Sequence, residues 1–229
     1  MTNTPCFSPA TFDFLRDLAA HNERTWFQTN RQRWEREVRD PAVRFITDFG
    51  PHLAKISKRF RADPRPVGGS LFRIHRDTRF SKDKRPYKTH TGIQFRHDVG
   101  KDAHAPGYYL HLEPGTVFVG IGIWHPDAPT ARKIRDAIAE KPAAWRRARD
   151  DAAFATRFTL EGESLKRPPA GYAKDHPLIV DLKRKDFIAA CTLTEDDVAA
   201  AGFLDDFTDI CRDGTPLVRF LCRALEVPF

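Results

Sequence analysis

Apolar residues recur at helical spacing through the first part of the chain. Phe12, Leu15 and Leu18 share one face of a helix that begins near Pro9, since proline is favoured in the first turn of a helix. The spacing continues, with interruptions, to about Ile56. The sequence therefore predicts an all-helical segment ahead of the rest of the fold.

Aromatic residues follow the first predicted helix. Asn22 is of a residue type that caps helices, and Trp26, Phe27 and Trp34 lie behind it at helical spacing. We interpret these aromatic side chains as packing residues on a helix face. If they were exposed together, they would instead indicate a surface for a partner.

The hydrophobic period changes to two after a turn-rich stretch that ends at Gly69. Alternation of apolar and polar residues indicates strands at 71–75, 91–97, 108–113 and 117–124. The letters EPGT at 113–116 are a hairpin signal. The last two strands should therefore pair antiparallel.

One face of this predicted hairpin is mostly aliphatic and should be core. The other face carries Tyr109, His111 and Glu113 on the first strand and Phe118, Gly120, Gly122 and Trp124 on the second. Because glycine has no side chain, Gly120 and Gly122 leave a trough that a ligand or another backbone can approach closely. A helix packed onto the trough is the alternative.

Helices return at 128–139, with Asp127 as cap, and at 142–153. Strands are predicted at 178–183 and 187–192, a short helix after Thr194 and a last helix at 216–226. The fold class is α+β, with a central, mainly antiparallel sheet and helical N-terminal and C-terminal segments packed around it. We expect a single domain over 7–226 and no separate second domain.

Positive charge is concentrated in one part of the chain, whose formal net charge is +7. Residues 58–101 hold thirteen Lys and Arg against four Asp and Glu, and the rest is 25 basic against 27 acidic. Such local basicity is typical of a binding patch rather than of general solubility.

The densest part of this patch is FRIHRDTRFSKDKRPYKTH at 72–90, with seven cations in nineteen residues. Guanidinium, ammonium and hydroxyl groups bind phosphate or carboxylate oxygens. We predict ligand contacts from Arg73, Arg76, Arg79, Ser81, Lys82, Lys84, Tyr87 and Lys88, with Asp77 orienting the cations. The alternative is a structural loop in which Asp77 pairs with the arginines.

A second basic stretch, LKRPPAGYAKDHPLIVDLKRKDF at 165–187, supplies Lys166, Arg167 and Lys183. We expect it to meet the first stretch as the second wall of one anion site. Within it, Asp175-His176 is either an acid/base pair or a turn.

We predict no metal site, and the sequence does not identify a cofactor. The histidines considered as ligands, none of which forms HExxH or a comparable spacing, are His75, His90, His97, His104, His111, His125 and His176. The absence of GxGxxG, GxxxxGK[ST] and GxSxG disfavours dinucleotide, P-loop and hydrolase chemistry. The cysteines lack CxxC spacing, so we expect them reduced, with Cys211 and Cys222 in the core.

Six stretches carry a resemblance to a known family. They are NERTWF, RIHRDTRFSKDKRPYKTH, APGYYLHLEPG, GIGIW, LKRPPAGYAKDHP and DLKRKDF. From about Phe7 to Leu225, the chain resembles a bacterial and fungal family catalogued as domain of unknown function 2461, also called the conserved hypothetical protein 02453 family. The resemblance implies a single domain and carries no reaction, cofactor or catalytic residue.

These observations favour a cytoplasmic protein that binds a phosphorylated or other anionic small ligand. The beginning of the sequence resembles no secretory signal, and no apolar run is long enough to cross a bilayer, so we expect no membrane association. If catalysis follows binding, the candidate acids and bases are Asp77, His75, His111 and His176. Nucleic-acid binding through the basic surface, or docking of an acidic partner, are the alternatives; the oligomeric state is left open.

Overall fold

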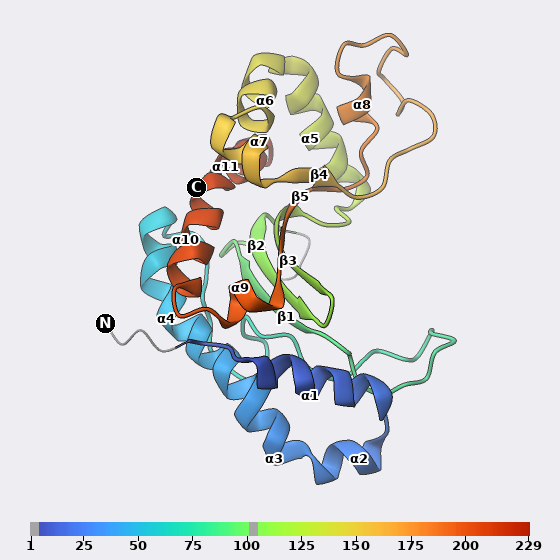
Figure 1. The fold of residues 1–229 in the computed structure, drawn as a ribbon. Coiled ribbons are helices and arrows are strands. Elements are labelled where there is room, and N and C mark those ends of the chain that lie inside the picture. Colours follow the sequence, from blue (N-terminus) through green and yellow to red (C-terminus); the bar gives the residue numbers. More distant parts are fainter. Residues whose placement is uncertain (1–4, 101–104) are drawn as a thin grey trace.

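The computed structural model describes residues 5–100 and 105–229, and its elements are drawn in Figure 1. The helices are α1 (Pro9–Ala20), α2 (Arg24–Thr29), α3 (Arg31–Trp34), the π-helical segment η1 (Glu35–Arg39), α4 (Asp40–Ile56), α5 (Ala128–Glu140), α6 (Pro142–Arg149), α7 (Ala152–Arg157), α8 (Ile179–Leu182), α9 (Glu195–Ala199), α10 (Phe203–Asp213) and α11 (Thr215–Ala224). The strands are β1 (Thr91–Arg96), β2 (Gly107–Glu113), β3 (Thr116–Ile123), β4 (Thr159–Glu161) and β5 (Phe187–Leu193).

The strands form one antiparallel sheet in the order β1-β2-β3-β5-β4. The predicted hairpin is present, with Glu113 opposite Thr116 and Gly115 at a φ of 76° in the turn between them. Helices precede the sheet, lie between its strands in the sequence and follow it. The α+β class and the mainly antiparallel sheet are thus confirmed.

Helices α4, α10 and α11 cover one face of the sheet (Figure 1). The layer is held by aromatic side chains, since Phe49 of α4 lies 4.7 Å from Phe95 of β1 and 4.8 Å from Phe207 of α10, both edge to face. These rings are fully buried, and such burial is the main source of stability in a fold of this kind.

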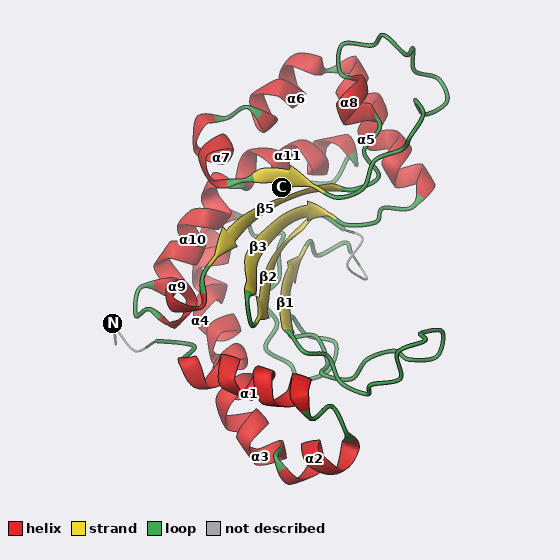
Figure 2. Ribbon diagram, turned by 45° about the vertical axis from the view of Figure 1, so that its right-hand side comes forward, coloured by secondary structure: helices red, strands yellow, loops and turns green. Residues whose placement is uncertain are grey.

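The opposite face of the sheet is concave (Figure 2). Among the described residues no helix covers it, so the alternative of a packed helix is not what the structure shows. Gly120 and Gly122 lie on this face as the alternation predicts. The atoms nearest to a methyl group added at Gly120 would be side-chain atoms of Phe118 and Tyr109, at 3.5 Å or more.

A smaller apolar cluster ties the basic segment, residues 72–90, to the N-terminal helices. Ile74 and Tyr87 are buried there with the side chains of Phe14, Leu18, Phe27 and Val38. Trp26 and Trp34 are partly buried against the same cluster. The prediction that Trp26, Phe27 and Trp34 are packing residues is therefore confirmed.

Three local predictions are wrong. Residues 71–75 form only isolated bridges, from Leu71 to Ile93 and from His75 to Tyr87, because the segment leaves the sheet edge to pack against α1 and α2. Residues 178–183 contain the helix α8, which follows Pro177. Asn22 does not cap α2, whose N-cap residue is Glu23.

The core position predicted for two cysteines is confirmed. Cys211 and Cys222 are fully buried in the main core, Cys6 and Cys191 are buried too, and all four are free thiols. Within the described part of the chain, no helix has the length and apolar character needed to cross a membrane.

Candidate functional site

A groove of about 410 Å³ lies on the concave face of the sheet. Its floor and walls come from all five strands and from both ends of the basic segment. The side chains and glycines that matter for its chemistry are Phe72, Lys88, His90, Gln94, Tyr109, His111, Phe118, Gly120, Gly122, Trp124 and Glu161. The trough predicted from the glycines of β3 is therefore part of a real cavity.

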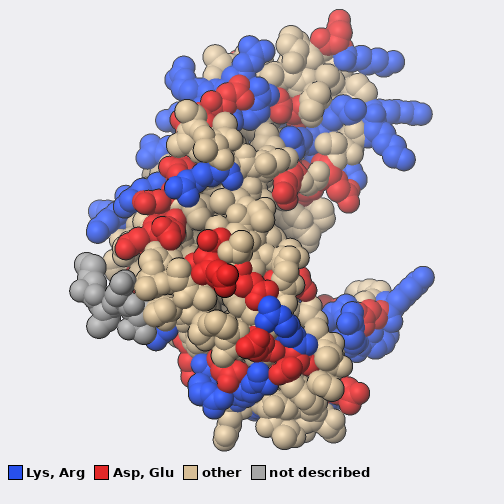
Figure 3. Space-filling view, in the orientation of Figure 1, with Lys and Arg blue, Asp and Glu red and all other residues tan. Residues whose placement is uncertain are grey.

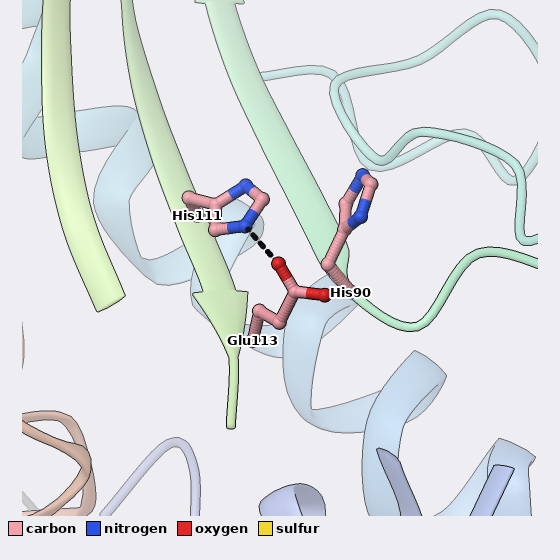
Figure 4. Close-up of side chains that lie close together, drawn as sticks. All are labelled: His90, His111 and Glu113. Atoms are coloured by element: carbon pink, nitrogen blue, oxygen red, sulfur yellow. Dashed lines mark hydrogen bonds and ion pairs between the residues drawn. The ribbon is translucent and has the colours of Figure 1, made fainter. Parts of the chain in front are cut away.

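Two imidazoles and a carboxylate gather at the β1 end of this groove. Alternation along β2 places His111 and Glu113 on the concave face. His90 immediately precedes β1, whose first residue Thr91 pairs with Leu112 of β2. One ring nitrogen of His90, one of His111 and one carboxylate oxygen of Glu113 lie within 4.8 Å of one another, and Figure 4 shows the carboxylate beside both rings.

A chain of hydrogen bonds fixes this cluster. The Tyr109 hydroxyl lies 3.0 Å from His111 Nδ1, and His111 Nε2 lies 3.2 Å from Glu113 Oε2. Thr89 Oγ1 donates to Glu113 Oε1 at 2.8 Å. The His111 ring also stacks on Phe118 with centroids 4.7 Å apart. The imidazole is thus held at both nitrogens and on one ring face.

Burial and neighbouring charges set the protonation of the cluster. Burial, and then the nearby His111, lower the pKa of His90 to about 4. Burial also lowers the pKa of His111, against the opposing influence of Glu113. Burial works against ionisation of Glu113, but the hydrogen bonds from Thr89 and His111 outweigh it, so the pKa of this carboxyl is lowered. Both rings are neutral and the carboxylate is ionised at pH 7.

Two further polar groups of the groove lack complementary partners. The half-buried Lys88 has its ammonium 5.3 Å from the ring centroid of Phe72 and pairs with no carboxylate of the described residues. Burial, and then the charge of Arg73, lower the pKa of Lys88. Gln94 is 7% exposed, and its buried Oε1 accepts no hydrogen bond within the described part of the chain. Buried polar atoms without partners are uncommon in native proteins, and a bound water, an ion or a functional role usually explains them.

Most charged groups in the middle of the basic segment pair with one another. Arg79 Nε and Nη2 bind Asp77, and Asp83 accepts from both Arg76 and Arg85. The bond from Arg79 lowers the pKa of Asp77 to about 2. Asp77 therefore pairs with an arginine, as the structural-loop alternative states.

A wider hollow of about 820 Å³ lies between α2 and the basic segment. Three predicted ligand residues, Arg76, Lys84 and Tyr87, line it. Arg76 is bound to Asp83, Lys84 Nζ donates to the carbonyl of Thr78, and the buried Tyr87 ring stacks on Phe27 with centroids 4.2 Å apart. These side chains are already engaged within the protein.

The two basic stretches do not meet. The first leads into β1 and the second follows β4, and these strands are the two edges of the sheet. In both ribbon views the segments project from opposite ends of the concave face (Figures 1 and 2). The expectation that Lys166 and Arg167 form the second wall of a single pocket with the basic segment is therefore wrong.

The remaining predicted residues fall in different places. Arg73, Lys82 and Lys166 are exposed, Ser81 is partly exposed, and Lys183 is partly buried beyond β4. Their contact with a ligand stays a prediction. His176 Nδ1 accepts from the backbone N–H of Leu178, so Asp175-His176 forms part of a turn. His75 is exposed at the base of the basic segment, and His104 lies outside the described residues.

The sequence did not place His90 and Gln94 beside His111 and Glu113. The alternation along 108–113 already placed His111 and Glu113 on one face with Tyr109, and this was the available signal. Motifs such as HExxH describe metal ligands on helices and in zinc fingers. On one face of a strand, neighbouring ligands are two residues apart, as His111 and Glu113 are.

Fold and site together define an α+β protein whose antiparallel sheet bears a ligand-sized groove with a histidine and glutamate cluster at one end. Residues 10–220 match the family model described as conserved hypothetical protein (DUF2461), so the chain belongs to that family. No curated protein and no solved structure matches the chain at the threshold used for those two comparisons.

Proposed function

We propose that this protein binds a small anionic ligand in the groove on the concave face of its sheet. The observation that carries the proposal is Lys88, a half-buried ammonium in the wall of the groove that has no carboxylate partner among the described residues. A phosphate or carboxylate oxygen is the partner that this group lacks.

The energetics of Lys88 support this assignment. Partial burial of a cation costs free energy unless an opposite charge or hydrogen-bond acceptors compensate for it. An aromatic face such as Phe72 compensates in part. A charge-assisted hydrogen bond to an anion contributes about 1.5–3 kcal/mol. The hydrogen bond from Lys88 would therefore increase the affinity of the groove for an anion, and anion binding would favour the charged form of Lys88.

The rest of the groove suits a ligand with a flat apolar portion. Tyr109 and Phe118 form its wall, and Gly120 leaves the floor open between them. Aromatic walls with a few placed polar groups are typical of small-molecule sites. Gln94 adds an amide whose oxygen still lacks a donor in the described structure.

The predicted ligand residues outside the groove have a supporting role in this proposal. Arg73, Lys82, Lys166 and Arg167 raise the positive potential at both ends of the concave face, and such fields accelerate the encounter with an anion. Arg76 and Arg79 contribute less than the sequence suggests, since aspartates already neutralise them.

The proposal can be tested with Lys88→Gln and a matched variant, Lys82→Gln, in the exposed part of the same segment. Calorimetric titration with inorganic phosphate and with a panel of phosphorylated and carboxylated metabolites would identify a ligand. We expect Lys88→Gln to weaken its binding about tenfold or more and Lys82→Gln to have a minor effect. Equal affinities of both variants and the wild type would contradict the role of Lys88.

A second candidate function, binding of single-stranded nucleic acid, is favoured by the distribution of charge. Figure 3 shows Lys and Arg side chains on both sides of the hollow in front of the sheet. Trp124, which is 52% exposed and stacks on the His125 ring with centroids 4.1 Å apart, lines the groove, and exposed aromatic side chains are typical of surfaces that bind single-stranded nucleic acid. Oligonucleotide binding that falls steeply with salt, and that Lys166→Gln weakens, would favour this function over the small ligand.

Docking of an acidic protein is the remaining alternative. Titration with a peptide of Asp and Glu over the same series of salt concentrations would detect it.

A further inference from the structure

The cluster at the β1 end of the groove has a property that does not depend on anion binding. Its side chains offer two imidazole nitrogens and one carboxylate oxygen, all within 4.8 Å of one another. We infer that His90, His111 and Glu113 form a binding site for a divalent first-row transition-metal ion such as Zn²⁺ or Fe²⁺. The inference stands whether or not the groove also binds an anion.

The distances suit an ion held by the three side chains. Bonds of about 2.0–2.2 Å place two ligand atoms of a tetrahedral ion about 3.3 Å apart. His111 Nε2 and Glu113 Oε2 already lie 3.2 Å apart. The rings of His90 and His111 are tilted, with centroids 4.7 Å apart, and binding of one ion requires the His90 ring to turn toward the other two ligands (Figure 4).

The donor set indicates the class of metal. Imidazole nitrogens combined with a single carboxylate suit Zn²⁺ and Fe²⁺, whereas Mg²⁺ and Ca²⁺ prefer oxygen ligands throughout. Glu113 supplies the negative charge of the cluster, and Lys88 lines the same groove without a carboxylate partner among the described residues. An ion of charge +2 therefore finds one neutralising carboxylate and two imidazole nitrogen donors.

Neighbouring groups orient these donors as partners of metal ligands do. Tyr109 is hydrogen-bonded to His111 Nδ1, so the other ring nitrogen, Nε2, is the one that faces Glu113. Thr89 holds Glu113 through Oε1 and leaves Oε2 toward His111. Hydrogen bonds of this kind fix the orientation of the ligands and raise the affinity of a site for its metal.

The position of the cluster predicts an ion that is open to small molecules. Three protein ligands leave at least one coordination position for water or another ligand, which is typical of catalytic rather than structural metal sites. His90 and His111 both line the groove, so a bound ion would border the same space as Lys88. A ligand anion could then contact the metal and the ammonium together.

The experiment is metal binding by the full chain after treatment with a chelator and its removal. Calorimetric titration with Zn²⁺ alone, and the visible absorption of added Co²⁺, report affinity and coordination. We expect one equivalent to bind the wild type, and His90→Gln, His111→Gln and Glu113→Gln each to weaken binding at least tenfold. His75→Gln removes an exposed histidine outside the cluster and should leave the affinity unchanged.

Circular dichroism and thermal unfolding of the metal-free proteins show which variants are folded. Zn²⁺ should raise the Tm of the wild type and of His75→Gln, but not that of His111→Gln. A folded wild type that binds no Zn²⁺ or Co²⁺ would overturn the inference. Equal binding by the wild type and by the folded cluster variants would also overturn it, because the metal would then be held elsewhere.

Discussion

The side-chain amide of Asn22 binds both backbone groups of Tyr87. Its Nδ2 donates to the carbonyl of Tyr87 at 3.0 Å, and its Oδ1 accepts from the N–H of Tyr87 at 3.0 Å. Both residues are buried. The side-chain amide therefore pairs with the backbone of Tyr87 as the backbone of a neighbouring strand would. This pairing anchors the base of the basic segment to the turn between α1 and α2.

Replacement of Asn22 by alanine should destabilise the protein by about 2–4 kcal/mol, because two buried backbone groups lose their partners. Urea unfolding followed by circular dichroism measures this change. Thr29→Ala is a suitable control, since it removes an exposed, local hydrogen bond to Thr25 and should cost less than about 0.5 kcal/mol. An unchanged midpoint for Asn22→Ala would show that the basic segment is held by other contacts.

The two glycines of β3 should respond differently to substitution. A methyl group at Gly120 would meet side chains at 3.5 Å or more, which is ordinary contact. At Gly122, where φ is 110°, it would lie 2.1 Å from the carbonyl oxygen of Phe187. We expect Gly120→Ala to keep the stability of the wild type within about 1 kcal/mol and Gly122→Ala to lose about 2 kcal/mol or more.

Substitutions at Gly120 and Gly122 also distinguish effects on ligand binding in the groove from effects on the stability of the fold. Gly120→Leu should narrow the groove and weaken any small ligand found by titration, while the protein stays folded. Comparable urea midpoints for Gly120→Ala and Gly122→Ala would mean that the backbone at Gly122 adjusts more easily than its close approach to Phe187 suggests.

The central hairpin was predictable because β2 and β3 each have one buried and one partly exposed face. Alternation predicts strands at 108–113 and 117–124; the observed β2 begins one residue earlier, and β3 begins and ends one residue earlier. Two other segments lack this contrast, and prediction failed there. The short edge strand β4 was not predicted, and the apolar run that contains Ile179 and Val180 became a helix despite its β-branched residues.

The candidate site was only partly predictable for a related reason. The face shared by Tyr109, His111 and Glu113 follows from alternation alone. The approach of His90 depends on the register between β1 and β2, and a long connection rather than a tight turn joins these strands. The basic segment drew attention by its composition, yet composition does not show that Asp77 and Asp83 neutralise its arginines.

Tyr109→Phe should weaken metal binding without unfolding the protein. The substitution keeps the ring and removes only the hydroxyl that holds His111 Nδ1. Loss of such a partner lowers metal affinity about 10- to 100-fold, which titration with Zn²⁺ would measure. Tyr172→Phe, which removes a hydroxyl bound to Asp136 beside α5, should leave the affinity unchanged. A fall in stability with no change in affinity would limit Tyr109 to packing.

Asp186 should give the protein a specific dependence of stability on pH. This carboxylate is 1% exposed and accepts hydrogen bonds from the backbone N–H groups of His125 at 2.8 Å and Glu163 at 2.9 Å, and it contacts the His125 ring. Burial opposes its ionisation, but these donors outweigh burial and lower the pKa of Asp186 below its ordinary value. The ionised carboxylate of Asp186 is therefore more stable in the folded protein than in the unfolded chain.

A carboxyl whose pKa is lower in the folded state stabilises the protein fully above its unfolded pKa of about 3.9. That stabilisation is lost as the pH falls through the lower, folded pKa. Asp186→Asn would place a side-chain amide N–H group against the backbone N–H donors that Asp186 now accepts from. It should lower the free energy of unfolding by about 2–4 kcal/mol at pH 7. We expect the gap between the urea stabilities of wild type and Asp186→Asn to narrow as the pH falls below about 4. The exposed Asp196→Asn should show a small difference throughout, and a gap for Asp186→Asn that is the same at pH 7 and pH 3 would refute this account.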